Sequence, residues 1–457
     1  MSNKNLALLG APLAAIALRV GLGGLGIDPA IANTLAITLL TAIWWVTEAL
    51  PIPATSLVPL VGLPLVGVLD QREAAGALGS HLILLLMGGL MLAKGLEKAG
   101  LHRRLSLHAL RLTGGRGGRR LVLAFMLAGA GLSMWISNTA ACLVLLPIAL
   151  AVIKQLDEPR TGAALILGIA FACNLGGVGT LVGTPPNLVF AGVYEEFSGA
   201  EYGFARWLGL GLPTVVLGLP LIWLWLTRGL AAGRRVELPS AGSWTIAERR
   251  ALVVFGLIVL LWVLRLEPAG GWARWTGIEL AGDSTVALFG VVLMFLLPDG
   301  KGGRLLDWQA ASDIPWGMLL LFAGGLCIAK GFAASGTSAW LGAGLSGTAT
   351  LHPLLVILAI CLAVTFLTEI TSNTATTSLL MPILAAGAVA AGLPMELLMV
   401  PAAMSASCAF MLPVATAPNA IAYGSGQVSV GYMARQGLVL NLLMAGVIAL
   451  VCYFNLG

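Results

Sequence analysis

The sequence has 457 residues, of which 58% are hydrophobic and only 10% are charged. About a quarter of the residues in a soluble domain are charged, so this composition excludes a soluble protein and predicts a polytopic membrane protein. The formal net charge of +5 comes from arginines in predicted loops and does not indicate nucleic-acid binding.

Stretches of about 20 apolar residues are long enough to span the hydrocarbon core of a bilayer as helices. The first begins near the N-terminus, where no cleavable signal peptide is evident, so we expect a membrane helix there. Eleven such spans are predicted, near residues 6–22, 33–50, 54–69, 81–98, 163–181, 206–227, 251–266, 284–298, 314–334, 396–414 and 433–455.

Two further apolar stretches, residues 121–153 and 353–391, are each long enough for two helices but are interrupted by a polar tripeptide. The interruptions are Ser137-Asn138-Thr139 and Ser372-Asn373-Thr374, and a proline follows each at the same distance, Pro147 and Pro382. Non-helical backbone is tolerated at membrane depth only inside protein or around a wet cavity. The sequence therefore predicts two re-entrant hairpins whose tips form one two-part binding site.

The basic residues are distributed unevenly around these hairpins. Seven Lys or Arg residues lie between residues 98 and 120, before the first hairpin, whereas residues 331–434 contain none. Because Lys and Arg collect in cytoplasmic loops, we expect the first hairpin to enter from the cytoplasm and the second from outside. The same rule predicts a multi-pass protein of the cell (inner) membrane with a cytoplasmic N-terminus and an external C-terminus.

The two halves of the chain repeat each other beyond the tripeptides. Residues 84–100 resemble residues 319–336, and residues 178–192, which contain a Gly/Pro break, resemble residues 413–426. Each half thus has a Gly-Gly helix, a hairpin and a broken helix in the same order, with the hairpins in opposite orientations. Interrupted helices at matching positions of an inverted repeat indicate the midplane site of a transporter.

The tripeptides offer two kinds of chemistry. Ser, Asn and Thr are good N-cap residues, and a helix N-terminus carries partial positive charge and free N–H donors that suit a carboxylate. Hydroxyl, amide and backbone carbonyl oxygens are hard donors that suit a small cation such as Na⁺. A pair of proline kinks is the structural alternative, but two matched tripeptides with two matched breaks favour a site.

The tripeptides, together with TEALPIPATSLVPL (47–60), GTPPN (183–187) and TAPNAIAYGSG (416–426), resemble the divalent anion–sodium symporter family over nearly the whole chain. The resemblance implies eleven transmembrane helices plus two hairpins, a homodimer, and an elevator motion of a transport domain against a scaffold domain. We expect the scaffold to comprise residues 1–112 and 238–345, and the transport domain residues 113–237 and 346–457.

Carried over to matching positions, the resemblance implies two sodium sites and one substrate site. The first sodium site would use Ser133, Ser137, Asn138 and the Gly183 carbonyl, and the second would use Thr368, Ser372, Asn373 and the Ala415 carbonyl. The substrate carboxylates would contact Ser137, Asn138, Thr139, Thr184, Ser372, Asn373, Thr374 and Thr416.

The predicted function is Na⁺-coupled symport of C4 dicarboxylates such as succinate, malate or fumarate. No Arg or Lys lies at the tripeptides, so helix ends and bound Na⁺ must neutralise the dianion. A citrate or sulfate carrier and a sodium-independent exchanger remain alternatives on the same fold, although the hydroxyls of Ser133 and Thr368 favour symport. An intramembrane enzyme would need a nucleophile–base pair or a metal cluster, which the spans lack, and the broken helices favour alternating access over a channel.

Overall fold

The computed structural model describes residues 3–112, 118–156, 158–230, 236, 242–266, 270–345 and 352–456. Within these ranges the regular structure is helical, apart from an isolated bridge between Pro298 and Arg304. Eight of the described helices are long and apolar enough to cross a membrane. The predicted all-α membrane class is therefore confirmed. The predicted domain boundaries after residues 112, 237 and 345 adjoin or lie in segments outside the described residues.

The first half of the chain forms twelve helices, two of which are the arms of the first predicted hairpin. They are α1 (Asn3–Gly24), α2 (Pro29–Thr47), α3 (Ile52–Thr55), α4 (Leu57–Leu65), α5 (Gln71–Leu78), α6 (His81–Lys98), α7 (Leu101–Leu112), α8 (Arg119–Ser133), α9 (Asn138–Ile153), α10 (Pro159–Val178), α11 (Pro185–Ser198) and α12 (Phe204–Leu226).

The second half forms eleven more helices within the described residues. They are α13 (Ile246–Val263), α14 (Gly271–Trp275), α15 (Asp283–Leu296), α16 (Trp308–Ser312), α17 (Trp316–Ala334), α18 (Thr337–Leu345), α19 (Pro353–Thr368), α20 (Asn373–Ala390), α21 (Met395–Ala406), α22 (Ala417–Gly424) and α23 (Val430–Leu456).

Nine of the eleven predicted spans coincide with helices to within five residues at either end, and two predictions were wrong. The span predicted at 54–69 is divided at Ser56 and ends at Leu65, because Gly67 turns the chain with a φ of 73°. The span predicted at 396–414 ends at Ala406, where side chains from other helices hold the following backbone in a loop.

Both hairpins break where the sequence indicated. Helix α8 ends at Ser133 and α9 begins at Asn138, while α19 ends at Thr368 and α20 begins at Asn373. The prolines that follow, Pro147 and Pro382, lie inside α9 and α20 without ending them. The interruptions are therefore local to the tripeptides.

The first arms of the two hairpins start at opposite ends of α23. At one end, Arg119 of α8 donates to Thr227 at 3.2 Å, and Arg228 donates to Gln436 near the start of α23 at 3.1 Å. At the other end, the ring of His352, which caps α19, lies 5.7 Å from the ring of Tyr453. The inverted repeat itself stays a prediction, with which these opposite starting points agree.

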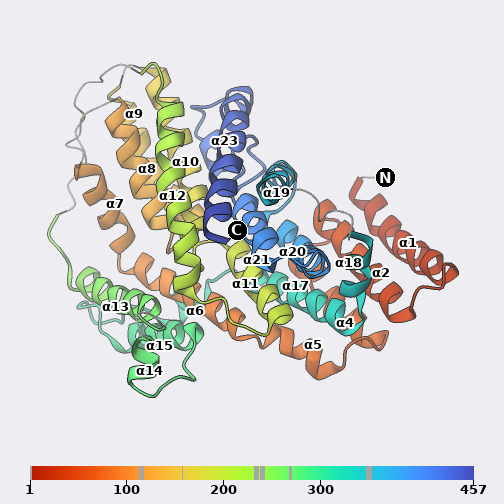
Figure 1. Cartoon of the computed structure of the whole chain (residues 1–457). Coiled ribbons are helices and arrows are strands. Elements are labelled where there is room, and N and C mark those ends of the chain that lie inside the picture. The colour runs from red at the N-terminus through yellow and green to blue at the C-terminus, as the bar shows by residue number, and fades with distance from the viewer. Residues whose placement is uncertain are drawn as a thin grey trace.

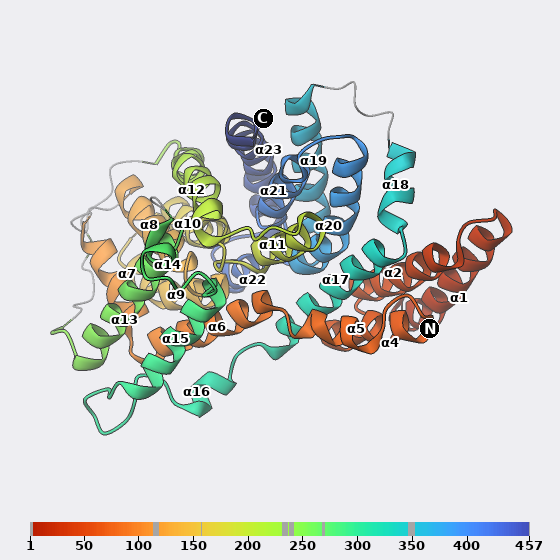
Figure 2. The same cartoon turned by 60° about the horizontal axis from the view of Figure 1, so that its bottom comes forward.

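The helices fall into two packed groups built from both halves (Figure 1). Helices α8–α12 stand beside α19–α23, and the two sets contact each other through α10 with α22, α11 with α21, and α12 with α23. Helices α4–α6 pack with α15–α17 along the opposite side, and α1 and α2 extend from one edge (Figure 2). The two broken helices meet where these groups adjoin, which positions the site.

Candidate functional site

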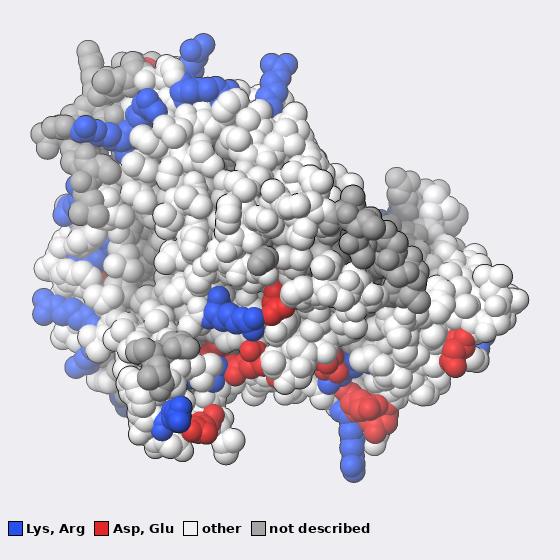
Figure 3. All heavy atoms as spheres, in the orientation of Figure 1, with Lys and Arg blue, Asp and Glu red and all other residues white. Residues whose placement is uncertain are grey.

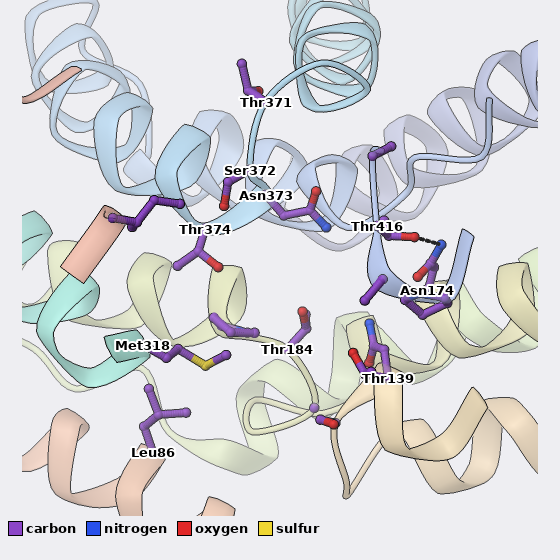
Figure 4. A pocket seen from close by; sticks show the side chains of 18 of the residues that line it. Leu86, Thr139, Asn174, Thr184, Met318, Thr371, Ser372, Asn373, Thr374 and Thr416 are labelled. Atoms are coloured by element: carbon purple, nitrogen blue, oxygen red, sulfur yellow. Dashed lines mark hydrogen bonds between the residues drawn. The ribbon is translucent and has the colours of Figure 1, made fainter. Parts of the chain in front are cut away.

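One cavity of about 630 Å³ lies between the two hairpin tips and the two broken helices (Figure 4). Its wall contains ten of the twelve predicted site residues: Ser137, Asn138, Thr139, Gly183, Thr184, Ser372, Asn373, Thr374, Ala415 and Thr416. The other two, Ser133 and Thr368, are fully buried behind this wall and bond to the asparagines of the tripeptides. The structure thus brings the two predicted half-sites into one space.

Four helices begin at the cavity, because residues of each N-terminus belong to its wall. These are α9 and α20, which start after the tripeptides, and α11 and α22, which resume after the Gly/Pro breaks. Ser137 caps α9 by accepting from the Ala140 amide at 3.1 Å, whereas Ser372 makes no such bond in α20. Helix N-termini present N–H donors and partial positive charge, so their convergence favours an anion.

The cavity wall contains few charges of its own. Of the described residues that line it, only Glu48 is charged. Glu48 ends α2 in the left-handed conformation, with a φ of 47°, and is the one non-glycine residue at positive φ in the described chain. An anion in this cavity would therefore have to be attracted by backbone dipoles, hydroxyls or a cation bound with it.

Behind the first tripeptide, the hydroxyl of Ser133 lies close to two other oxygen atoms. The Ser133 hydroxyl lies 2.6 Å from Asn138 Oδ1 and 2.7 Å from the Cys173 carbonyl oxygen. A hydroxyl has one proton to donate, so it cannot fully satisfy both acceptors. Hydroxyl, amide and carbonyl oxygens gathered this closely are donors that suit a hard cation.

A similar cluster lies behind the second tripeptide. The Thr368 hydroxyl lies 2.6 Å from Asn373 Oδ1 and 3.0 Å from the Ala406 carbonyl oxygen. In both halves the hydroxyl comes from the end of the first hairpin arm and the carbonyl from the first part of the broken helix, inside α10 for Cys173 and at the last residue of α21 for Ala406. Each half of the chain thus brings a hydroxyl, an amide oxygen and a helix carbonyl oxygen together behind its tripeptide.

The carbonyls exposed by the two breaks are held by a pair of asparagines. Asn187 Nδ2 donates to the carbonyls of Gly177 and Thr180 at 3.0 and 2.7 Å. Asn419 Nδ2 donates to the carbonyls of Ala409 and Leu412 at 3.0 and 3.1 Å. Buried carbonyls need partners, and these bonds fix the loops that carry Gly183 and Ala415.

Two glycines allow the first tripeptide to approach the first break closely. A Cβ atom at Gly177 would lie 2.7 Å from Asn138 Oδ1, and one at Gly183 would lie 2.5 Å from the Gly177 carbonyl oxygen. Both distances are too short for a side chain. The oxygen cluster therefore depends on the absence of side chains at these positions.

Glu369 has a role that sequence reasoning did not identify. Its side chain is 3% exposed and does not line the cavity. Its Oε1 accepts hydrogen bonds from the backbone amides of Phe410 and Met411, and its Oε2 accepts one from the amide of Leu412, all at 2.8–2.9 Å. Asn441 of α23 donates to the same Oε1 at 2.7 Å. The sequence signal for this contact was Asn441, a polar residue in the middle of the apolar helix α23. The carboxylate organises the loop before the second break rather than binding a ligand.

Comparison with solved structures shows the fold. The YdaH transporter of Alcanivorax borkumensis matches with a TM-score of 0.61 and 16% identity, over 92% of this chain and 98% of that one. MtrF of Neisseria gonorrhoeae also matches with a TM-score of 0.61, at 15% identity, over 94% of this chain and 96% of that one.

Comparison of sequences shows the family. The proteins named sodium-dependent dicarboxylate transporter SdcS from Staphylococcus saprophyticus and Staphylococcus aureus are 43% and 41% identical over 445 residues, which is 92% of this chain and 85% of theirs. The family model described as citrate transporter matches residues 42–398. The chain therefore belongs to the citrate transporter family, in agreement with its predicted membership of the divalent anion–sodium symporters, and is a transport protein.

Proposed function

We propose that this protein carries C4 dicarboxylates such as succinate, malate or fumarate across the cell membrane together with Na⁺. The observation that carries the proposal is the pair of matched oxygen clusters, each next to helix N-termini that open into one shared cavity. The names of the 43% and 41% identical relatives agree with both the ion and the substrate class.

The substrate is held at its two ends. Each carboxylate faces the start of a hairpin helix and of a resumed helix, where free N–H groups and hydroxyls donate to it. Ser137, Asn138, Thr139 and Thr184 serve one end, and Ser372, Asn373, Thr374 and Thr416 serve the other. A four-carbon chain with two carboxylates matches a cavity that has an anion-binding wall contributed by each half.

Sodium neutralises the charge that the cavity wall cannot. One Na⁺ binds Ser133, Ser137, Asn138 and the Gly183 carbonyl, and a second binds Thr368, Ser372, Asn373 and the Ala415 carbonyl. Because a desolvated dianion without counter-charge is costly, the substrate enters only when these sites are filled. This dependence couples the downhill movement of Na⁺ to uptake of the anion.

The protein lies in the inner membrane with its N-terminus in the cytoplasm and its C-terminus outside. Support comes from the surface charge: Lys and Arg gather at the upper end of the view in Figure 3, above α9, α10 and α12. Basic residues favour the cytoplasmic side. The first hairpin then enters from the cytoplasm and the second from outside.

Alternating access follows from an elevator motion, in which the group containing the hairpins moves against the group containing α4–α6 and α15–α17. Ion pairs between α11 and the other group, such as Lys330 with Glu196 at 2.9 Å, lie across this boundary and have to exchange partners during the motion. A homodimer supplies the fixed frame against which the moving part travels.

The test is uptake of radiolabelled succinate into proteoliposomes that contain the purified protein. An inward Na⁺ gradient should drive accumulation, and replacing Na⁺ with K⁺ or choline should abolish it. Equal uptake in Na⁺ and choline would identify a sodium-independent exchanger instead.

A tricarboxylate is the second candidate substrate, because the matching family model is described as a citrate transporter. Competition of unlabelled citrate and succinate against labelled succinate separates the two. Inhibition by citrate at lower concentration than succinate would favour the tricarboxylate.

A further inference from the structure

Asn174 connects the two halves of the molecule at the cavity. It lies on α10 of the first half, has no solvent exposure and belongs to the cavity wall, and it was not among the site residues predicted from the sequence. Its Nδ2 lies 3.0 Å from Thr416 Oγ1, 3.0 Å from Asn419 Oδ1 and 3.4 Å from the Ala409 carbonyl oxygen, all in the second half. Figure 4 shows the bond to Thr416.

The surrounding hydrogen bonds fix the orientation of the Asn174 amide. Asn419 donates through its own Nδ2 to the carbonyls of Ala409 and Leu412, so its Oδ1 has to face Asn174. Turning the Asn174 amide over would place two oxygens against each other. Asn174 therefore presents its NH₂ group, and not its carbonyl, to Thr416.

The same bonds determine what the Thr416 hydroxyl can do. Thr416 Oγ1 accepts from Asn174 Nδ2 at 3.0 Å and from the Asn419 amide, at the start of α22, at 3.2 Å. A hydroxyl has two acceptor lone pairs and one proton. With both lone pairs occupied, the Thr416 proton points away from both donors, and no acceptor within the described part of the chain receives it.

The matching hydroxyl of the first half is not constrained in this way. Thr184 precedes α11 as Thr416 precedes α22, but its side chain makes no capping bond, and no hydrogen bond to it is found among the described residues. Its hydroxyl can rotate to donate or accept. The two ends of the cavity thus differ in how strongly they are prepared for a carboxylate.

We propose that Asn174 is a positioning residue that makes the Thr416 hydroxyl a permanent donor to one substrate carboxylate. The inference rests on the proposed function, since it assigns the carboxylate at the end of the cavity formed by the second half. A donor that already points toward its ligand loses little rotational freedom on binding, and a hydrogen bond to a charged group is among the stronger ones. The end of the cavity at Thr416 is therefore the tighter carboxylate subsite.

The test is a double-mutant cycle on the full-length protein, with succinate affinity measured by calorimetry at saturating Na⁺. Thr416→Val keeps the shape but removes the hydroxyl, and should weaken binding at least about tenfold. Asn174→Ala should weaken it about five- to tenfold, since Thr416 is then free to rotate. In the Thr416→Val background, Asn174→Ala should add less than about twofold, because its effect acts through that hydroxyl.

Thr184→Val is the matched partner in the first half. Combined with Asn174→Ala, it should give the product of the two single effects, because Asn174 has no bond to Thr184. If the alanine variant is not monodisperse, Asn174→Ser provides a milder variant for the same cycle. The serine side chain is too short to reach both Thr416 and Asn419.

A second measurement, the melting temperature, separates positioning of the Thr416 hydroxyl by Asn174 from general support of the loop before α22. The Na⁺-dependent increase in melting temperature without succinate should be the same in Asn174→Ala as in the wild type, because the oxygen clusters do not include Asn174. A loss of that increase, an unchanged affinity in Thr416→Val, or an Asn174 effect that persists in the Thr416→Val background would each overturn the inference. Failure of the wild type to bind succinate in Na⁺ would instead reject the proposed function.

Discussion

At the scale of single residues, each proposed sodium site contains one hydroxyl group that lies close to two other oxygen atoms. Ser133 and Thr368 each face two oxygens of the protein with one proton, at 2.6–3.0 Å. Neither hydroxyl can donate to both of its oxygens at once, so each tripeptide has a group of close oxygen atoms behind it. In the proposed function, Na⁺ binds these oxygens directly.

The hydroxyls of Ser133 and Thr368 should therefore contribute more to Na⁺ binding than to the stability of the fold. Ser133→Ala and Thr368→Val should each raise the Na⁺ concentration for half-maximal succinate uptake by about tenfold, the effect of losing one favourable contact to a charge. Uptake into proteoliposomes at varied external Na⁺ measures this.

Matched controls are available for both changes. Ser106 and Thr214 are equally buried and donate to helix carbonyls at 2.8 and 2.9 Å, away from the cavity. Ser106→Ala and Thr214→Val should leave the Na⁺ dependence unchanged. Equal shifts in site and control variants would contradict a sodium role for the two clusters.

At the scale of elements, the sequence located the breaks but not all of the ends. The tripeptides and the Gly/Pro breaks could be predicted because capping residues and prolines act on the backbone next to them. The end of α21 at Ala406 could not, because the loop that follows is held by Glu369, distant in the sequence. The ten residues in the cavity wall followed from the repeat and the family resemblance, whereas Asn174 is visible only once α10 meets α22.

Glu369 should be required for transport as an acceptor of backbone N–H groups. Glu369→Gln keeps the size but replaces one of its two acceptor oxygens with a donor, facing either the Leu412 amide or the amides of Phe410 and Met411. An unsatisfied buried donor costs about 1–3 kcal/mol, so we expect a lower melting temperature and a large loss of succinate uptake.

The control for Glu369 is Glu279→Gln, which removes the same charge at an exposed position. It should change neither the melting temperature nor uptake. If Glu369→Gln behaved like this control, the loop before the second break would not depend on the carboxylate.

At the scale of the whole molecule, the first arms of the two hairpins begin at opposite ends of α23. A cysteine at His352, which caps α19, should then be accessible from outside the cell, and one at Gln155, just past the end of α9, should be accessible only from the cytoplasm. The six native cysteines are buried and free, and serine or alanine in their place gives a clean background.

Labelling of intact cells with a membrane-impermeant thiol reagent should modify His352→Cys and spare Gln155→Cys until the membrane is permeabilised. The reverse pattern would mean that the protein is inserted in the opposite orientation. Labelling of both from one side would rule out hairpins that enter from opposite faces.

Asn138 and Asn373 are the residues at which to test whether the two halves of the chain build one site for Na⁺ and a dicarboxylate. Each has its Oδ1 in an oxygen cluster and also lies in the cavity wall. Asn138→Ala and Asn373→Ala should each weaken succinate binding at least about tenfold, by calorimetry on monodisperse protein at saturating Na⁺. Wild-type affinity in either variant would show that its tripeptide is only a bend in the chain and that the two halves do not share one site.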